Sequence, residues 1–319
     1  MSPRTKSYIL LFIATLIWGV AGPVIKYTEG FISPLVFLLY RLAIAGGVGA
    51  VALAVTHRHN WPKSGGQRFM LLVYCTLSTP VALGLLFIGY NLTSALTASV
   101  LSAFYPILAA IVGMVFLHEH ITKRENLGMG IALLGTALVT IEPFLNGGTT
   151  SSSTMLGNLL IIASLLIGVL VTVMTKLILR HSTNPASLTH LSFIIGFIAL
   201  LPVVLYQTPL SEIVRQITAA PLMAHLGVLY MALVSGTVAY ILWYWGQKTI
   251  EIGESSLFSY IYPLITLPLS IFWLHEPVTR ILIAGSAIIG VGVVIAEVKE
   301  HKVIPQSSES PSSRKRQRQ

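Results

Sequence analysis

Arg41 is the side chain of this sequence best suited to hold a charged solute, because it is the one charged residue well inside a long apolar run. The run extends from Phe31 to Val55, and helix rise places Arg41 roughly 15 Å from its start. The planar guanidinium matches a carboxylate or a phosphate. Burying it in a bilayer costs about 2.5–3.5 kcal/mol, so such a residue usually faces a wet cavity or a partner. We predict that Arg41 binds an acidic group of a substrate. The alternatives are a structural arginine bonded to helix carbonyls and one that extends outward to the headgroups.

Two prolines inside apolar runs mark a second group of candidates. Each follows a tyrosine by one residue and a serine by four: Ser102, Tyr105 and Pro106, and Ser259, Tyr262 and Pro263. Proline has no amide hydrogen, so the carbonyl of that serine loses its helical partner. Unpaired backbone in a membrane is tolerated where protein or water covers it, and it forms substrate sites in transporters. We predict helix breaks at both prolines, with the serines and tyrosines lining a hydrated cavity. The alternative is a kink that only shapes the bundle.

Trp18, Tyr40 and Pro23 complete the candidate set. The two aromatic residues neighbour the features above, although an aromatic in a membrane helix more often packs or sits at the interface. We predict that Pro23 breaks its helix as well. Cys75 is the single cysteine, which excludes an intramolecular disulfide and a multi-cysteine metal cluster. The sequence predicts no catalytic residue, no metal and no cofactor.

The composition places these residues in a bilayer. Apolar residues make up 54% of the chain and charged residues 10%, and the mean hydropathy is +0.80. A soluble domain has about 25% charged residues, so this chain could not cover a water-facing surface. The net charge of +9 comes from basic residues between apolar runs, where they orient membrane helices. We therefore predict contact with lipid and none with nucleic acid.

The apolar runs predict an all-α integral membrane protein with ten transmembrane helices, because a spanning helix needs about 20 mostly apolar residues. The runs are Tyr8–Ile25, Phe31–Val55, Phe69–Asn91, Ser94–Leu117, Leu127–Ile141, Met155–Thr175, Pro185–Tyr206, Leu222–Gly246, Ser255–Leu274 and Ile281–Ala296. Sixteen Lys and Arg fall in the loops on the side of the N-terminus and three in the opposite loops. This bias predicts that both termini are cytoplasmic. The Ser-rich, basic tail 303–319 is predicted to be disordered.

A duplication fixes the predicted architecture. Seven of the 21 residues from 102 to 122 are identical to those 157 positions later, including the Ser, Tyr and Pro above and the triplet Leu117-His118-Glu119. Gly128 and Gly135 recur as Gly285 and Gly292, and each pair lies on one helix face, which predicts a packing seam. Each copy has five spans, an odd number, so the second copy enters the membrane from the opposite side. Inverted repeats of this kind are typical of transporters.

The sequence resembles the drug/metabolite transporter superfamily, EamA type. The resemblance rests on Trp18-Gly19 and Lys26 in the first span, on Pro34 and Arg41 around the second, and on the repeated Pro, Glu, Thr and spaced Gly. It covers an EamA-like unit at 8–141 and a second at 156–296. The family implies a ten-helix bundle that moves small metabolites, often amino acids and often outward. This chain departs from the pattern in its second half, where Gly168 replaces the Trp18-like residue and no Arg corresponds to Arg41.

We therefore predict a secondary transporter in the cell membrane that exports small polar metabolites, such as amino acids or related compounds, by alternating access. No phosphate-binding GxxxxGKS loop is present, so ATP is not the direct energy source. The alternative from another class is an integral-membrane enzyme that acts on lipid-linked substrates, and a non-conducting sensor is a third. Whether the protein is a monomer or a homodimer does not follow from the sequence.

Overall fold

A computed structural model of the chain describes residues 2–56, 64–117, 123–145, 151–180, 184–250, 255 and 257–297. The predicted basic tail 303–319 and Glu119 lie outside the described residues. Within these ranges the chain is helical with short connections, and they contain no strand.

The helices follow one another along the chain without a second type of layer. The first half contains α1 (Pro3–Glu29), α2 (Pro34–Thr56), α3 (Gly65–Thr76), the π-helical η1 (Leu77–Leu83), α4 (Gly84–Leu92), α5 (Ala95–Ser102), α6 (Tyr105–Leu117) and α7 (Lys123–Leu145). The second half contains α8 (Ser151–Arg180), α9 (Pro185–Gln207), α10 (Leu210–Ala219), α11 (Leu222–Leu229), the π-helical η2 (Tyr230–Val238), α12 (Ala239–Gln247), the 3₁₀ segment η3 (Leu257–Ile261), α14 (Tyr262–Phe272) and α15 (Arg280–Glu297).

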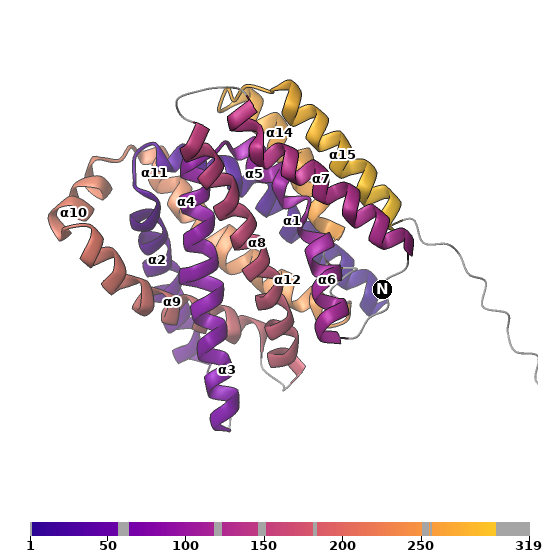
Figure 1. Cartoon of the computed structure of the whole chain (residues 1–319). Helices are drawn as coiled ribbons and strands as arrows, with labels where there is room; N and C mark the ends of the chain where they lie inside the picture. The colour runs from indigo at the N-terminus through magenta and orange to yellow at the C-terminus, as the bar shows by residue number, and fades with distance from the viewer. Residues whose placement is uncertain are drawn as a thin grey trace, which may run out of the picture.

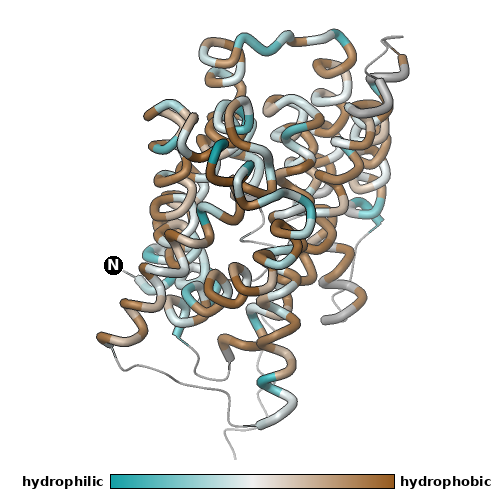
Figure 2. Tube along the Cα trace, turned by 90° about the vertical axis from the view of Figure 1, so that its left-hand side faces the viewer, coloured by the Kyte–Doolittle hydropathy of each residue, from teal (hydrophilic) through white to brown (hydrophobic). Residues whose placement is uncertain are grey.

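Six helical stretches are long and apolar enough to cross a membrane. They are Pro3–Glu29, Pro34–Thr56, Gly65–Leu92, Thr154–Leu179, Pro185–Gln207 and Leu222–Gln247. Four shorter apolar helices lie where the fourth, fifth, ninth and tenth spans were predicted, at Ala95–Ala109, Asn126–Glu142, Phe258–Phe272 and Arg280–Ile295. The short helix α10 was not predicted. Figure 2 shows that most of each helix is hydrophobic and that hydrophilic residues are most frequent near helix ends.

The bundle has two central helices and two paired edges. α1 packs against α12 and α14, while α8 packs against α4, α5 and α6. α7 runs along α15 at one edge of the bundle, and α2 runs along α9 at the opposite edge (Figure 1). Corresponding helices begin 157 residues apart at three places: α3 and α11, α6 and α14, and α7 and α15.

The prolines interrupt the helices unequally. Ala103 and Phe104 form a turn between α5 and α6, one residue before the Tyr105-Pro106 pair that starts α6. In the second half, 3₁₀ geometry changes to an α-helix at Tyr262-Pro263. The break predicted at Pro23 does not occur, because α1 is helical from Pro3 to Glu29.

The repeated Glu occupies a structural corner. After α14, His275 adopts a left-handed conformation with φ of 54°, and the Glu276 carboxylate accepts hydrogen bonds from the amides of Ala95 (2.7 Å) and Leu96 (2.8 Å). These are the first amides of α5, which have no partner within their own helix. Glu276 therefore caps the helix that carries Ser102.

Glycines bring the backbones of α7 and α15 together. A Cβ atom at Gly292 would lie 2.5 Å from the Ala132 amide nitrogen and 2.6 Å from the Gly128 carbonyl oxygen. A Cβ at Gly135 would lie 2.8 Å from the Gly285 carbonyl oxygen. The small residues of both helices thus form one seam within the chain.

We expect Gly292→Ala to destabilise the protein by about 1–3 kcal/mol, because backbone atoms cannot move aside as a side chain can. The matched control is Gly290→Ala on the same helix, where nothing lies within 4 Å of the added methyl. This control should keep or raise the thermal unfolding temperature in detergent, since Ala favours helix over Gly by about 1 kcal/mol. Equal unfolding temperatures for the two variants would contradict the seam.

Candidate functional site

A cavity of about 240 Å³ lies between α1 and α8. Residues of η1, α4, α5 and α6 from the first half, and of η2, α12, η3 and α14 from the second half, also line it. Its volume lies just below the roughly 300–1,000 Å³ of ordinary ligand sites and suits a small molecule. Six of the seven predicted substrate-binding residues line it: Trp18, Arg41, Ser102, Tyr105, Ser259 and Tyr262. The seventh, Tyr40, is absent from the lining. Its hydroxyl lies 3.4 Å from Nδ1 of His225 on α11.

Arg41 is buried in the cavity wall, with 1% of its surface exposed. Its Nε has no hydrogen-bond partner in the described part of the chain. The guanidinium carbon lies 5.5 Å from the centre of the Phe87 ring, and a Cβ at Gly236 would lie 3.1 Å from Nη2. Arg41 therefore does not extend to the headgroups, and its Nε makes no hydrogen bond to a carbonyl in the described residues. An uncompensated buried donor fork is suited to an incoming carboxylate.

Three aromatic rings form one wall of the cavity. The ring of Trp18 lies 5.0 Å from Tyr240, edge to face, and 5.1 Å from Trp243. The indole Nε1 of Trp18 donates a 2.9 Å hydrogen bond to the Ser235 carbonyl. This bond holds the Trp18 ring against the cavity, so the wall offers apolar and π surface to a ligand.

Both π-helical segments contribute to the cavity, which the sequence analysis did not predict. Wide turns of this kind are frequent at functional sites. Ser78 in η1 and Ser235 in η2 line the cavity and are 157 residues apart. Extending the duplication backward from Ser102 would have found them, because Val81 and Ala82 also recur 157 residues later as Val238 and Ala239.

Several hydroxyl groups of the cavity wall already donate a hydrogen bond within the protein. Ser102 donates to the Ala98 carbonyl and Ser164 to the Ala82 carbonyl, both at 2.8 Å. Thr172 donates to the Gly168 carbonyl (3.0 Å), so the 2.7 Å bond between Tyr105 and Thr172 must have Tyr105 as its donor. A hydroxyl whose one O–H already donates a hydrogen bond can still accept hydrogen bonds through its lone pairs. These groups can therefore only accept hydrogen bonds from a ligand.

Charge in the cavity has one sign among the described residues. Arg41 is the only charged side chain in the lining. Lys26 is bound instead to the backbone at the end of α4, with Nζ 2.8 Å from the Tyr90 carbonyl and 2.6 Å from the Thr93 carbonyl. Outside the spans, Arg215 on α10 bonds to Glu212 at the surface and lowers the pKa of that carboxyl to about 2. The cavity thus offers one cationic donor and a set of neutral acceptors.

Proteins whose sequences are similar to this chain are named as transporters and efflux pumps. The sequence model of the EamA-like transporter family matches residues 5–141 and 155–297. An uncharacterized transporter of Archaeoglobus fulgidus is 28% identical over 290 residues, covering 91% of this chain and 98% of the relative. A probable amino-acid metabolite efflux pump of Escherichia coli is 25% identical over 296 residues, covering 91% and 94%. A solved crystal structure aligns with a TM-score of 0.65 at 16% identity, covering 94% of this chain and 100% of the other, which supports the fold alone.

One hydrogen bond explains why α1 passes through Pro23 unbroken. Proline frees the carbonyl four residues earlier, at Gly19, and the Thr266 hydroxyl donates to that oxygen at 2.7 Å. We expect Thr266→Val to lower stability by about 1–3 kcal/mol, because the buried carbonyl would lose its donor. Thr266→Ser, the control, keeps the donor and should cost less although it removes a methyl group. Thermal unfolding of the two purified variants tests the order, and the opposite order would refute this role.

Proposed function

This chain belongs to the EamA-like transporter family, and on that premise we propose that it is a secondary transporter that exports amino acids or related small polar metabolites by alternating access. Membership and the apolar helices make it a multi-pass membrane protein that acts on a small-molecule substrate. The family and the similar proteins are named as transporters and efflux pumps, so the interpretation as a lipid-modifying enzyme is set aside.

The substrate class is supported mainly by Arg41. The buried Arg41 guanidinium has no acidic partner among the described residues, and such a group gains most from a ligand that brings a carboxylate. The E. coli relative is named as a probable amino-acid metabolite efflux pump, and a relative from Streptantibioticus cattleyicolor as a probable terminal-alkyne amino-acid exporter. Both names refer to amino acids or their metabolites, and an amino acid carries a carboxylate.

The remaining wall supports an uncharged side chain on the substrate. The acceptor-only hydroxyls and the face of Trp18 can receive an ammonium group, and the aromatic wall can cover an apolar side chain. No carboxylate among the described lining residues would balance a second positive charge. We therefore propose neutral zwitterions and monocarboxylates as substrates, in preference to lysine- or arginine-like solutes.

Alternating access is supported by the duplication. The helix starts spaced 157 residues apart and the packing of α1 and α8 on equivalent helices favour two copies of a five-span unit, at 8–141 and 156–296. We propose that the copies are inverted, with ten spans and both termini on the cytoplasmic side of the cell membrane. Two inverted halves can pack in two equivalent ways, each open to one side.

The energy source is proposed to be the substrate gradient or exchange. No ATP-binding loop is present in the sequence, and no carboxylate lines the cavity in the parts of the chain that the structure describes. Proton coupling through the cavity therefore has no obvious carrier, which favours exchange or facilitated export.

We expect counterflow of labelled neutral amino acids and organic acids into vesicles containing the purified protein, and the loss of that flux in Arg41 variants. Arg41→Ala should lower the transport efficiency about 10- to 100-fold, because hydrogen bonds to charged groups contribute about 1.5–3 kcal/mol and each 1.4 kcal/mol is tenfold. Arg41→Lys should also lose efficiency, since an ammonium cannot form the two-pronged contact.

The matched control is Tyr40→Phe, one residue away on α2 and outside the cavity, which should transport like the wild type. Wild-type flux in both Arg41 variants would refute the carboxylate site. Absence of saturable flux for every solute in the panel would refute the transport proposal itself.

A further inference from the structure

We propose that two side-chain pairs close the cavity at its two ends: Tyr74 with Tyr244 at the end where α1 begins, and Phe87 with Met231 at the end where α1 finishes. The proposal rests on the proposed function, because a transporter needs a barrier on each side of its binding site. Both pairs join the third helical stretch (α3, η1 and α4) to the eighth (α11, η2 and α12).

The tyrosine pair is a hydrogen-bonded contact inside the bundle. The hydroxyls of Tyr74 on α3 and Tyr244 on α12 lie 2.5 Å apart, and both side chains are buried, at 0% and 4% exposure. Tyr244 lines the cavity. Gly246, two residues later, packs against Leu11 of α1, which places the pair toward the N-terminal end of that helix. Separating α3 from α12 would break this bond.

The duplication relates the two pairs to each other. Met231 lies 157 residues after Tyr74, and Tyr244 lies 157 residues after Phe87. The same interval separates the starts of α3 and α11. The repeat therefore maps the Tyr74–Tyr244 pair onto the Phe87–Met231 pair. If the halves are inverted copies, the two pairs lie at opposite ends of the cavity.

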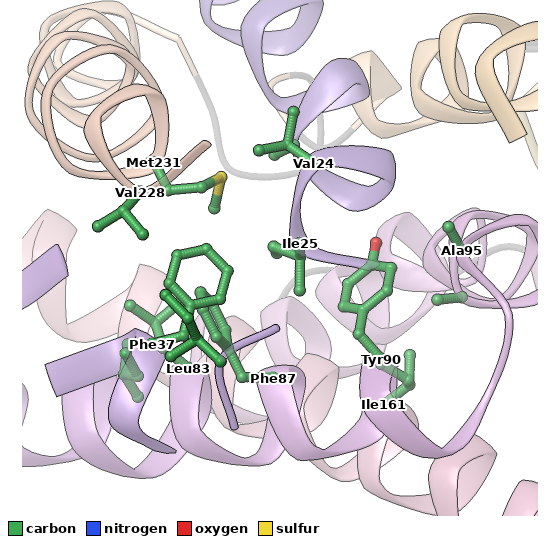
Figure 3. Close-up of a cluster of buried hydrophobic side chains, with 14 of the residues drawn as sticks. Val24, Ile25, Phe37, Leu83, Phe87, Tyr90, Ala95, Ile161, Val228 and Met231 are labelled. Atoms are coloured by element: carbon green, nitrogen blue, oxygen red, sulfur yellow. The ribbon is translucent and has the colours of Figure 1, made fainter. Parts of the chain in front are cut away.

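The second pair is apolar. Phe87 and Met231 are buried, at 0% and 2% exposure, and both line the cavity. Figure 3 shows Met231 and Val228 of the eighth stretch approaching the phenylalanine rings of Phe37 and Phe87, with Ile25 of α1 on the other side. Phe87 and Met231 belong to one buried apolar cluster, so the proposed barrier at this end would rest on packing, with no hydrogen bond among its described members.

The two barriers therefore differ in chemistry, and the apolar one is connected to Arg41. The guanidinium carbon lies 5.5 Å from the centre of the Phe87 ring, while Gly236 of η2 abuts Nη2. Phe87 is thus a positioning residue for Arg41. A carboxylate that bonds to Arg41 competes with the ring for the guanidinium, because charge-assisted hydrogen bonds are stronger than a cation–π contact. Substrate binding would then loosen the Phe87–Met231 barrier.

The single cysteine of the chain makes the tyrosine barrier measurable. Cys75 directly follows Tyr74, is fully buried, and packs in the same apolar cluster as Tyr74 and Tyr244. Opening between α3 and α12 should expose its thiol to N-ethylmaleimide. The measurement needs neither an engineered cysteine nor a known substrate.

We expect Tyr74→Phe and Tyr244→Phe to raise the rate of Cys75 alkylation about 2- to 10-fold in the purified full-length protein, because each breaks the hydrogen bond between the two hydroxyls and keeps the ring. Phe87→Ala should lower the rate below that of the wild type, since weakening the opposite barrier favours closure of this one. Tyr230→Phe is the matched control. Tyr230 lies in the same helical stretch as Tyr244, and the variant removes the part-buried hydrogen bond from the Tyr230 hydroxyl to the Ile17 carbonyl of α1; it should leave the rate unchanged.

Faster alkylation in both tyrosine variants but not in Tyr230→Phe supports the barrier, even if no solute is transported and the proposed function fails. Unchanged alkylation in both tyrosine variants, or an equal increase in Tyr230→Phe, overturns it even if wild-type transport is saturable. Intact folding of each variant is established by its thermal unfolding transition, and either tyrosine variant alone suffices if the other does not fold.

Discussion

The structure depends on one constraint: a backbone carbonyl released from a membrane helix must find a donor inside the protein. Pro23 releases the Gly19 carbonyl, which receives the Thr266 hydroxyl. In the π-helical segments, the Ala82 carbonyl accepts a hydrogen bond from the Ser164 hydroxyl, and the Ser235 carbonyl accepts one from the indole of Trp18. Each of these donors comes from another helix, so irregular backbone binds the central helices together around the cavity.

The same bonds determine what the cavity can offer to a ligand. Because Ser102, Ser164 and Thr172 donate hydrogen bonds to backbone carbonyls, these three hydroxyls can offer only their lone pairs to a ligand. The Nε of Arg41 has no hydrogen-bond partner among the described residues, and Arg41 is the one cationic side chain in the described lining. The cavity therefore presents the Arg41 guanidinium, which suits an anion, and several hydroxyl oxygens that accept hydrogen bonds. A zwitterion can satisfy both.

Duplication extends this logic to the proposed motion. Three residues of the cavity wall are identical in the two copies: Ser78 and Ser235, Ser102 and Ser259, and Tyr105 and Tyr262. The copies differ where the proposed barriers lie. Tyr74 of the first copy corresponds to Met231 of the second, and Phe87 corresponds to Tyr244. If the two proposed arrangements exist, these different contacts at the two ends would make their stabilities unequal.

Much of the fold could be predicted from composition and spacing, because bilayer thickness sets helix length and a repeated motif implies a repeated unit. The helical class, the positions of the apolar helices and membership of an EamA-like family were accessible in this way, as were six of the residues that line the cavity. Other features depend on neighbours that are distant in sequence. The sequence favoured a break at Pro23, but Thr266 compensates for it from more than two hundred residues away. It placed Tyr40 with Arg41, but the helix turns one side chain toward His225 and the other into the cavity. Local chemistry thus determined by itself which residues could bind a solute, and tertiary packing decided which of them face the same space, because side-chain direction and hydrogen-bond partners exist only once the helices are assembled.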